Sequence, residues 1–199
     1  MPRALSTNEI SDFRERLCDA AATLFAARGR EGFSLRELAA ELGVSAMTPY
    51  RYFKDKDDIL AAVRARAFNR FAELLEAAYE TKSDPVSRAN AVGQAYLRFA
   101  FAEPASYRLM FDLAQPDEAH YPELVRATER ARATMTRHVP ALVARGIFAG
   151  DPELIGHVFW SAIHGAVVLK LAGKLTDECD FDRIIAETFR ALSAGFAPR

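Results

Sequence analysis

A long apolar segment near the C-terminal end constrains the fold of this chain more than any other feature. Asp151-Pro152 has the pattern of a helix cap followed by a first-turn proline, and the helix expected from there to Ala172 is apolar on nearly every side. A helix that is apolar on every side must be buried on every side. A domain of this size cannot easily bury such a helix alone, so the segment predicts a partner surface.

The segment that begins at Asp180 predicts a second helix for the same surface. Its apolar residues recur every three or four positions up to Leu192. In the preceding segment, small residues such as Gly165 would allow another helix to approach closely. Two such helices from each of two subunits would form a four-helix interface about a twofold axis. The sequence therefore predicts a homodimer that associates through about 151–173 and 180–197.

A second feature, the stretch 34–56, predicts two short helices with a tight break between them. Ser34 and Glu37 form a Ser-x-x-Glu capping box, and apolar residues follow at helical spacing up to Leu42. Gly43 stands where a left-handed residue usually ends a helix. Two helices joined by a turn of about three residues that contains Gly are typical of the helix-turn-helix, whose second helix enters the DNA major groove.

The second helix of this motif is expected from Ala46 to Tyr52, with Ser45 as its cap. Pro49 would forfeit only the first bond within the helix, so the helix can still form. Met47 has two open interpretations, because it can touch a thymine methyl group or simply fill a gap in the packing.

Side chains that bond phosphates and base edges crowd this second helix and the residues after it. The net charge of the chain is −1, so any positive field for nucleic acid must be local. A solvated charged face is the alternative, because Asp55, Asp57 and Asp58 interleave with the lysines. The donors are Ser45, Thr48, Tyr50, Arg51, Tyr52, Lys54 and Lys56, with Arg28, Arg30 and Arg36 nearby in the sequence.

Helical periodicity also dominates the rest of the chain. A capping box at Ser6-x-x-Glu9 opens a first helix, a long helix starts after Lys56, at Asp57 and Asp58, and runs to about residue 79, and a loop is expected at 115–117. The predicted fold is all-α, with an N-terminal three-helix helix-turn-helix DNA-binding domain (1–55). A C-terminal helical bundle (56–199) is expected to bind a ligand and to dimerise.

The motif Met-Thr-Pro-Tyr-Arg-Tyr-Phe-Lys-Asp-Lys at 47–56, preceded by Leu-Arg-Glu-Leu-Ala and Gly-Val-Ser, resembles the DNA-binding region of TetR-type transcriptional regulators. The resemblance covers about Ile10 to Leu60. It implies an all-helical homodimer that binds palindromic operators in double-stranded DNA, usually as a repressor that a small molecule releases. The common family pattern has Lys-Gly-Thr-Leu-Tyr where this chain has Ala-Met-Thr-Pro-Tyr at 46–50.

The resemblance also implies roles for individual residues. Four match positions that contact phosphates in the family: Ser34, Tyr50, Tyr52 and Lys56. Four others lie where bases or nearby phosphates are read: Ser45, Met47, Thr48 and Arg51. The nearby cations Arg36 and Lys54 complete the predicted DNA-binding set.

The C-terminal half carries a second resemblance. Trp160-x-x-x-His164-Gly165 resembles the Trp-His-Gly motif of one class of TetR-type C-terminal domains. Pro-x-x-Tyr-x-x-Met-Phe at 104–111 resembles the segment that usually precedes it. The resemblance implies a subclass of C-terminal domain and does not indicate a ligand.

Aromatic and thioether side chains in this half predict either an effector pocket between helices or a filled core. Few charged residues fall among them, so we expect an apolar or aromatic effector. No Cys or carboxylate is placed to join the histidines as a metal ligand, so no metal or other cofactor is expected. The residues predicted to bind the effector are Phe99, Tyr107, Met110, Phe111, Trp160 and His164.

The remaining features separate two functional hypotheses. Cys18 and Cys179 are too few and too far apart for a disulfide framework, and neither a signal peptide nor an apolar run long enough to span a membrane is apparent. A cytoplasmic protein with no membrane partner is therefore expected. A ligand-responsive transcriptional regulator is the first hypothesis. An all-helical ligand carrier or enzyme with a non-functional helix-turn-helix is the second, but no catalytic pair or phosphate loop supports an enzyme.

Overall fold

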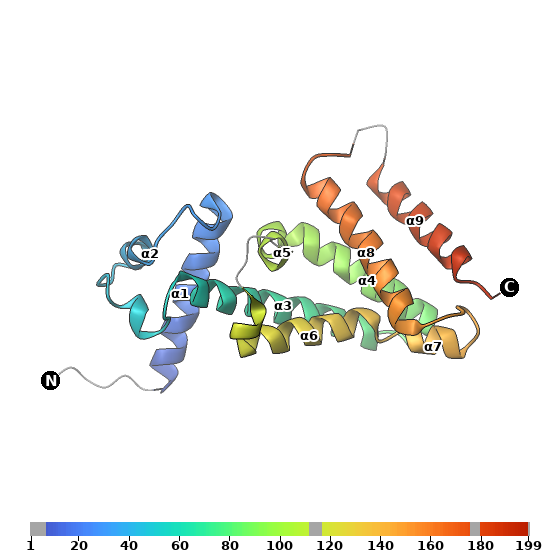
Figure 1. The fold of residues 1–199 in the computed structure, drawn as a ribbon, viewed down its shortest axis with the longest axis horizontal. Helices are drawn as coiled ribbons and strands as arrows, with labels where there is room; N and C mark the ends of the chain where they lie inside the picture. Colours follow the sequence, from blue (N-terminus) through green and yellow to red (C-terminus); the bar gives the residue numbers. More distant parts are fainter. Residues whose placement is uncertain (1–6, 112–116, 176–179, 199) are drawn as a thin grey trace. The chain divides into compact units, whose positions relative to one another are not determined.

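The structure is a computed structural model that describes residues 7–111, 117–175 and 180–198, and these residues form helices without a strand among them (Figure 1). The predicted all-α class is confirmed. The elements are α1 (Thr7–Arg28), α2 (Leu35–Glu41), the 3₁₀ helix η1 (Pro49–Arg51), α3 (Lys56–Glu80), α4 (Pro85–Ala102), α5 (Pro104–Phe111), the 3₁₀ helix η2 (Glu118–His120), α6 (Pro122–Thr136), α7 (Val139–Ala144), α8 (Pro152–Leu171) and α9 (Phe181–Gly195).

Some sequence predictions fall on residues that the structure does not describe. The predicted cap at Ser6, most of the predicted loop at 115–117 and Cys179 lie outside the described residues. Cys18, in contrast, is described, and its thiol is buried in the core. Burial raises the pKa of this thiol, which keeps it protonated.

Two compact units divide the chain. The head comprises Met1–Asn69 and Ala105–Thr128, and the body comprises Arg70–Pro104 and Glu129–Arg199. Helices α3 and α6 therefore contribute residues to both units. The predicted boundary after residue 55 follows the chain order, whereas the compact units are interleaved because the first turns of α3 complete the core of the head.

The core of the head is a cluster of apolar side chains from α1, α2, the segment after η1, and α3. Leu17, Leu38 and Phe53 are fully buried in it, and Ile59 and Leu60 of α3 close it. Burial of each Leu, Ile or Phe side chain contributes about 1.5–3 kcal/mol relative to exposure. The short helices of the head are therefore held by packing, because α2 alone is too short to be stable in water.

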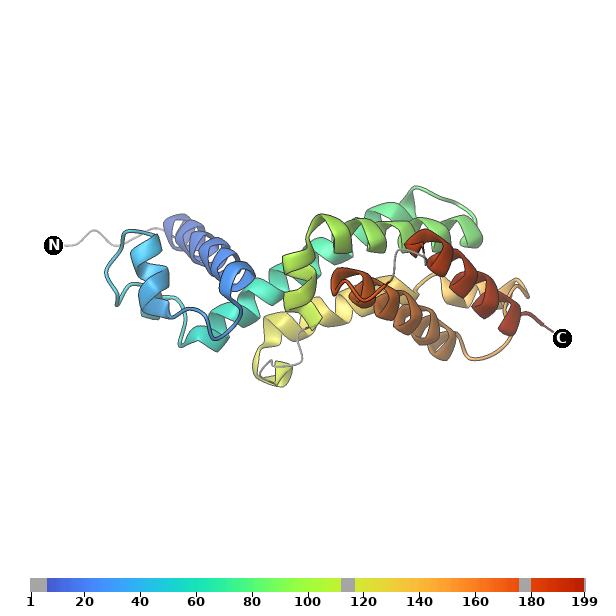
Figure 2. The ribbon, with the colours of Figure 1, turned by 90° about the horizontal axis from the view of Figure 1, so that it is seen from above.

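In the body, α4 packs on α7 and α8, and α8 packs on α7 and α9. Figures 1 and 2 both show α8 and α9 side by side and antiparallel. The ring of Phe71 on α3 meets the rings of Tyr96 and Phe99 on α4 edge to face, with centroids 5.3 and 5.1 Å away. Such aromatic pairs add about 0.5–1.5 kcal/mol each beyond the burial of their area.

The helix starts in the body agree with their sequence signals. The carboxylate of Asp84 accepts a hydrogen bond from the Ser87 amide, and Pro85 is the first residue of α4. Asp151 caps α8 in the same way through the amide of Glu153. These caps satisfy amides that would otherwise lack a partner at a helix start, so local sequence defines where α4 and α8 begin.

Helix α8 is only partly covered within a single chain. It has a mean hydropathy of 1.5 over an 18-residue window, of which 28% is buried, so by length and composition it could cross a membrane. This corrects the prediction that no apolar run is long enough to span a membrane. The histidines that interrupt the segment do not lower its mean hydropathy enough to prevent this. A core helix passes the same test, and one face of α8 does pack on the body.

The uncovered face of α8 is apolar or small along its length. Leu154 is 58% exposed and Val168 is 43% exposed, and both lie on the side of the helix that carries Ser161 and Gly165. A Cβ atom added at Gly165 would meet no atom within 4 Å. The segment predicted to need a partner surface therefore retains an apolar face that this chain does not cover.

Candidate nucleic-acid interface and ligand cavity

The first helix of the motif forms as the sequence predicts. Oγ of Ser34 accepts a bond from the Glu37 amide at 3.3 Å, and the Glu37 carboxylate accepts one from the Ser34 amide at 2.8 Å. The Ser34 hydroxyl also donates to this carboxylate at 2.9 Å, and the hydroxyl and amide donors together lower the pKa of Glu37, so the capping box is complete with the carboxylate ionised. Gly43 has a φ of 66°, and its amide bonds the Ala40 carbonyl at 3.0 Å, which ends α2.

The second predicted helix, from Ala46 to Tyr52, is wrong in type and length: the structure has only η1, Pro49–Arg51. Pro49 has no amide hydrogen, so it cannot bond the Ser45 carbonyl four residues before it. That carbonyl instead accepts the Thr48 amide at 2.8 Å, which is a bond over three residues. Bonds over three residues favour a tight 3₁₀ turn rather than an α-helix.

Two sequence predictions about this segment concern single side chains. Oγ of Ser45 accepts the Met47 amide at 3.4 Å, so this residue does serve the backbone at the start of the segment. The Met47 side chain is 66% exposed, so it does not fill a gap in the packing of this chain. Of its two interpretations, the exposure favours contact with a binding partner.

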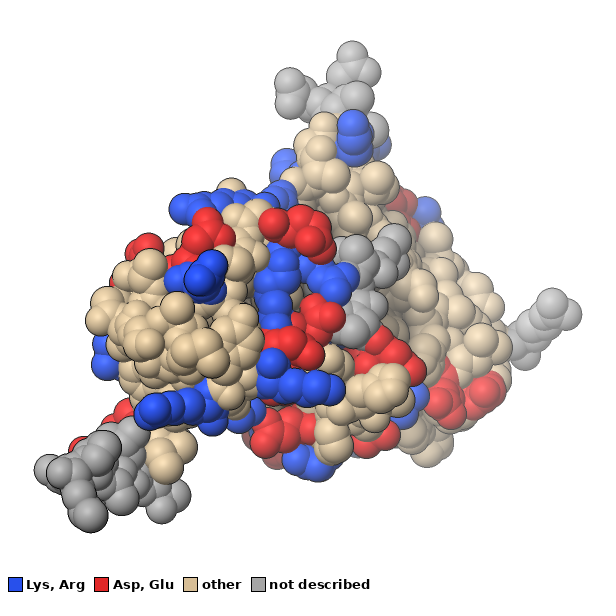
Figure 3. Space-filling model, turned by 60° about the vertical axis from the view of Figure 1, so that its left-hand side comes forward, with Lys and Arg blue, Asp and Glu red and all other residues tan. Residues whose placement is uncertain are grey.

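The ten residues predicted to contact DNA differ in exposure. Those with exposed side chains are Ser34, Arg36, Ser45, Met47, Tyr50, Arg51 and Lys54, and those that are half-buried are Thr48, Tyr52 and Lys56. Figure 3 shows Lys and Arg atoms interleaved with Asp and Glu atoms on this side of the molecule, so the positive charge is local rather than continuous. This pattern agrees with the expectation from the net charge.

Lys56 holds a loop of the head together. Its Nζ donates to the carbonyl oxygens of Arg30 at 2.7 Å and Phe33 at 3.2 Å, and it lies 5.4 Å from the centre of the Phe33 ring. Two backbone acceptors between α1 and α2 thus depend on one ammonium group. Its predicted phosphate contact stays a prediction, and the structure adds a role in folding.

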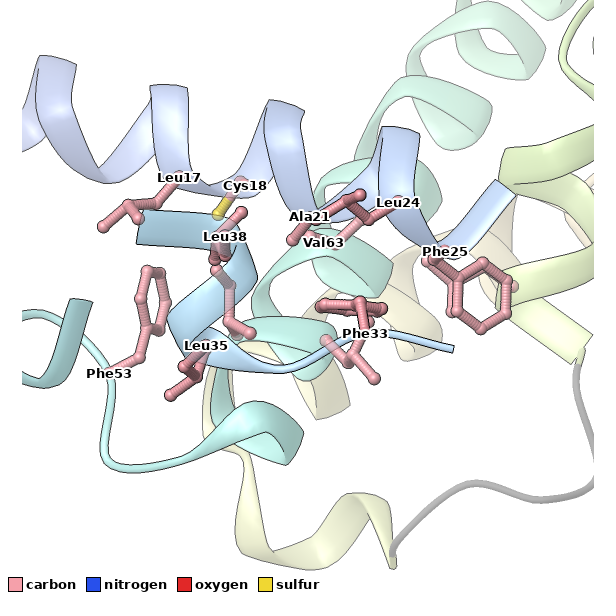
Figure 4. Packing of buried hydrophobic residues seen from close by; sticks show 13 residues of the cluster. Leu17, Cys18, Ala21, Leu24, Phe25, Phe33, Leu35, Leu38, Phe53 and Val63 are labelled. Carbon is pink, nitrogen blue, oxygen red and sulfur yellow. The ribbon is translucent and has the colours of Figure 1, made fainter. Parts of the chain in front are cut away.

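Tyr52 and its neighbour anchor the recognition segment to the core. The Tyr52 ring packs on Phe13 of α1 with centroids 5.0 Å apart, and the Arg14 guanidinium lies 4.5 Å from the centre of the Phe53 ring. Figure 4 shows Phe53 beside Leu17 and Leu38 in the cluster. These contacts position the exposed side chains of 45–51 against a rigid support.

Two carboxylates that interleave with the lysines cap α3. Oδ1 of Asp55 accepts the Asp58 amide at 2.9 Å, and Oδ2 of Asp58 accepts the Lys54 amide at 2.9 Å. Asp57 accepts a bond from Arg30 at 2.8 Å. The carboxylates therefore serve the backbone and one arginine. In the described part of the chain, no hydrogen bond or ion pair engages the side chains of Arg36, Arg51 or Lys54.

A cavity of about 320 Å³ lies within the body, between α4, α7 and α8. Its lining contains no Asp, Glu, Lys or Arg. Among its polar members, His138 is mostly buried, and burial lowers the pKa of this imidazole from 6.5 to about 4. The lining residues are Val86, Ala89, Asn90, Val92, Gly93, Tyr96, Met135, His138, Val139, Leu142, Ile147, Phe148, Gly156, Phe159, Trp160, Ile163, Phe189 and Ser193.

The structure does not gather the six residues predicted to bind an effector. Only Trp160 lines the cavity. Phe99 is fully buried in the aromatic core of the body, and Nδ1 of His164 lies 3.2 Å from the hydroxyl of Tyr96, which does line the cavity. Tyr107, Met110 and Phe111 belong to the head, where the first two are fully buried.

Sequence reasoning missed the polar residues of the cavity, above all His138 and Asn90. A weak signal existed, since Ala89 and Gly93 place small residues four apart on α4 and leave a notch in its surface. Nothing in the sequence shows which large side chains stand opposite that notch. No cluster of three or more His, Cys, Asp or Glu side chains suited to a metal ion occurs in the described ranges.

Comparisons with known proteins match both units. The family model described as "Bacterial regulatory proteins, tetR family" matches residues 17–63. The family model described as "Tetracyclin repressor-like, C-terminal domain" matches residues 89–194, which is more than half of the chain. The second range includes Trp160, His164 and Gly165.

Relatives and solved structures agree with these matches. An uncharacterised HTH-type transcriptional regulator of Mycobacterium tuberculosis is 26% identical over 188 residues, which cover 94% of this chain and 82% of that protein. The HTH-type transcriptional activator FasR of Mycolicibacterium smegmatis is 27% identical over 132 residues, or 66% of this chain and 59% of that protein. A protein of unknown function from Rhodococcus sp. RHA1 matches with a TM-score of 0.81 and 28% identity over 100% of both chains.

Replacement of Lys56 by Met tests its role in folding. The substitution keeps the apolar stem but leaves the carbonyls of Arg30 and Phe33 without their donor, so we expect unfolding to become easier by about 1–3 kcal/mol. Lys54→Met, at an exposed side chain, should change the free energy of unfolding by less than about 0.5 kcal/mol. Urea unfolding followed by circular dichroism measures both, and equal stabilities of the two variants would contradict the assignment.

Acidification should destabilise the protein through His138. Between the ordinary pKa of 6.5 and the folded-state pKa of about 4, the unfolded chain binds a proton that the folded chain rejects. The stability associated with the neutral imidazole is present above pH 6.5 and declines towards pH 4, by about 2 kcal/mol between pH 7 and pH 5. The free energy of unfolding, measured at pH 7 and at pH 5, should fall less in His138→Phe than in the natural protein. In His120→Phe, which replaces an exposed histidine, it should fall as much as in the natural protein.

Proposed function

The chain belongs to the TetR family of bacterial transcriptional regulators, and from this premise we propose that it is a homodimeric repressor that binds a palindromic operator and is released by a small apolar effector. Its role as a DNA-binding regulator rests on the family and its relatives. A ligand carrier or enzyme with an idle helix-turn-helix is not favoured, because the relatives are transcriptional regulators. A cytoplasmic location fits this role.

The exposed donors of the recognition segment carry the DNA-binding part of the proposal. Arg51 and Lys54 project from a segment that Tyr52 and Phe53 anchor to the core, while nearby carboxylates are engaged in capping α3. A guanidinium or ammonium group with no protein partner can bond phosphates without breaking existing contacts. Arg36, at the exposed start of α2, adds a third such cation.

The uncovered apolar face of α8 supports the homodimer. A large exposed apolar surface is typical of an interaction site. Leu154 and Val168 flank small residues at Ser161 and Gly165, which would allow a second helix to approach closely. A twofold dimer presents two recognition segments, so its matching operator has two related half-sites. A palindromic operator has this symmetry.

The repressor and effector parts come from the family resemblance and from the apolar cavity in the body. Opposite activity occurs among relatives, since FasR is described as an activator. A transcriptional reporter driven by the protein's own upstream DNA distinguishes the two, because deletion of a repressor raises the signal and deletion of an activator lowers it. Release of the purified protein from the same DNA by apolar compounds would support effector control.

The salt dependence of DNA binding tests the interface. Each phosphate contact makes the slope of log K against log salt more negative by about 0.9, so loss of one contact per subunit should make the slope of a dimer less steep by about 2. We expect Lys54→Ala to weaken binding similarly on every sequence, and Met47→Ala to change the preference among operator variants. Electrophoretic retardation at several salt concentrations measures both, and identical behaviour of the two variants would refute this division of roles.

The dimer can be tested with two leucines that are similarly exposed in the single chain. Leu154→Asp places a charge on the apolar face of α8, where a partner would bury it, so we expect dissociation to monomers at micromolar concentration. Leu74→Asp, whose leucine is 47% exposed on α3, should leave the dimer intact. Sedimentation velocity measures the mass, and a Leu154→Asp dimer as stable as the natural one would exclude this interface.

A further inference from the structure

We infer that the cavity of the body binds an uncharged, two-ring-sized, largely apolar ligand whose single polar group exchanges a hydrogen bond with Nδ1 of His138. The inference rests on the effector control proposed above and adds the chemical class of the ligand and the residue that recognises its polar group. None of the residues first expected to bind an effector supplies this contact.

The size of the cavity limits the ligand. A cavity of about 150 Å³ is large enough for one benzene molecule, and this cavity has a volume of about 320 Å³. A ligand with about two rings, or roughly 10–15 non-hydrogen atoms, would therefore fill it. The exposed side chains of Val86 and Ile147 among the lining residues show that the cavity reaches the surface, so a ligand can enter.

The lining selects against charge. None of the lining residues is acidic or basic apart from His138, and its lowered pKa leaves it neutral at pH 7. A carboxylate or ammonium group in this cavity would lose its hydration without gaining an opposite charge. An anionic or cationic ligand should therefore bind more weakly, by at least an order of magnitude, than a neutral ligand of the same shape.

His138 supplies the polar contact. Its Nδ1 is buried and has no hydrogen-bond partner in the described part of the chain. Buried polar atoms are nearly always paired, so a polar ligand atom that bonds this nitrogen would remove an unfavourable feature of the cavity wall. The other polar members of the lining include Asn90, which is exposed and can bond water. His138 thus offers the ligand a buried ring nitrogen, whereas Asn90 competes with water for its bonds.

Gly93 provides a way to fill the cavity without disturbing the helix. It lies within α4, and an added Cβ atom would meet nothing within 4 Å. A leucine at this position would project into open space beside the cavity and occupy part of it. Gln94, the next residue, is exposed and does not line the cavity, so Gln94→Leu is a matched control on the same helix.

Three two-ring probes separate the requirements: 2-naphthol is neutral and has one hydroxyl group, naphthalene has no polar group, and 2-naphthoate carries a charge. Isothermal titration of the natural protein at pH 7 should show 2-naphthol binding about three- to tenfold tighter than naphthalene, the value of one net hydrogen bond. It should bind at least tenfold tighter than 2-naphthoate. Equal or tighter binding of 2-naphthoate would overturn the inference without any variant.

The variants then locate the site. His138→Phe should bind 2-naphthol no better than naphthalene, Gly93→Leu should lose most affinity for both, and Gln94→Leu should resemble the natural protein. Circular dichroism confirms that each variant is folded. Unchanged 2-naphthol affinity in folded Gly93→Leu, or an unchanged preference for the hydroxyl in folded His138→Phe, would overturn the site.

The same preparations distinguish the two proposals. DNA retardation in the presence of 2-naphthol reports effector control, whereas titration reports the cavity. Binding with the expected ranking but without DNA release would contradict effector control by this ligand class and support the ligand site. DNA release that persists in folded Gly93→Leu would place the effector elsewhere and overturn the site, while control by a ligand would stand.

Discussion

The burial of α8 is the physical constraint on which the body of this protein depends. The helix is apolar around nearly its whole circumference, and each apolar side chain left in water forgoes about 1.5–3 kcal/mol of stabilisation. Its own chain covers only one face, through α4, α7 and α9. The lining residues Gly156, Phe159 and Ile163 belong to this covered face, while Leu154 and Val168 lie on the opposite one. One helix thus carries the proposed ligand contacts and the proposed partner surface.

This double role suggests how a ligand would affect the dimer. A ligand that displaces the covered face of α8 also moves the residues on the opposite face, because a helix is a nearly rigid rod on this length scale. In a dimer, such a movement would change how the two subunits meet. The two-state behaviour that regulation requires is a property of that dimer, since a continuous helix alone does not establish coupling.

The charged side chains of the head form two groups: some make contacts within the fold, and others are exposed for the proposed contact with DNA. Lys56 and Arg30 satisfy backbone carbonyls or a carboxylate, and Asp55 and Asp58 cap α3. Arg51 and Lys54, only a few residues away, project outward from η1 and the turn after it. The near-neutral net charge of the chain is compatible with DNA binding for this reason, because many nearby carboxylates are already engaged with the protein itself.

The sequence by itself determined most of the helices, the caps of α2, α4 and α8, and the first helix of the helix-turn-helix, because these features depend on residues only a few positions apart. The bonds of Ser34 with Glu37 and of Asp84 with Ser87 are examples of this short range. The 3₁₀ turn around Pro49 also has a local cause, because this proline lacks the amide hydrogen that an α-helix needs. Only the tertiary structure decided that Lys56 holds a loop 23–26 residues before it, and that Tyr107 and Met110 pack in the head rather than beside a ligand cavity. Only the tertiary structure could place His138 beside Gly93, because the shape of a cavity depends on side chains from distant helices that no local pattern encodes.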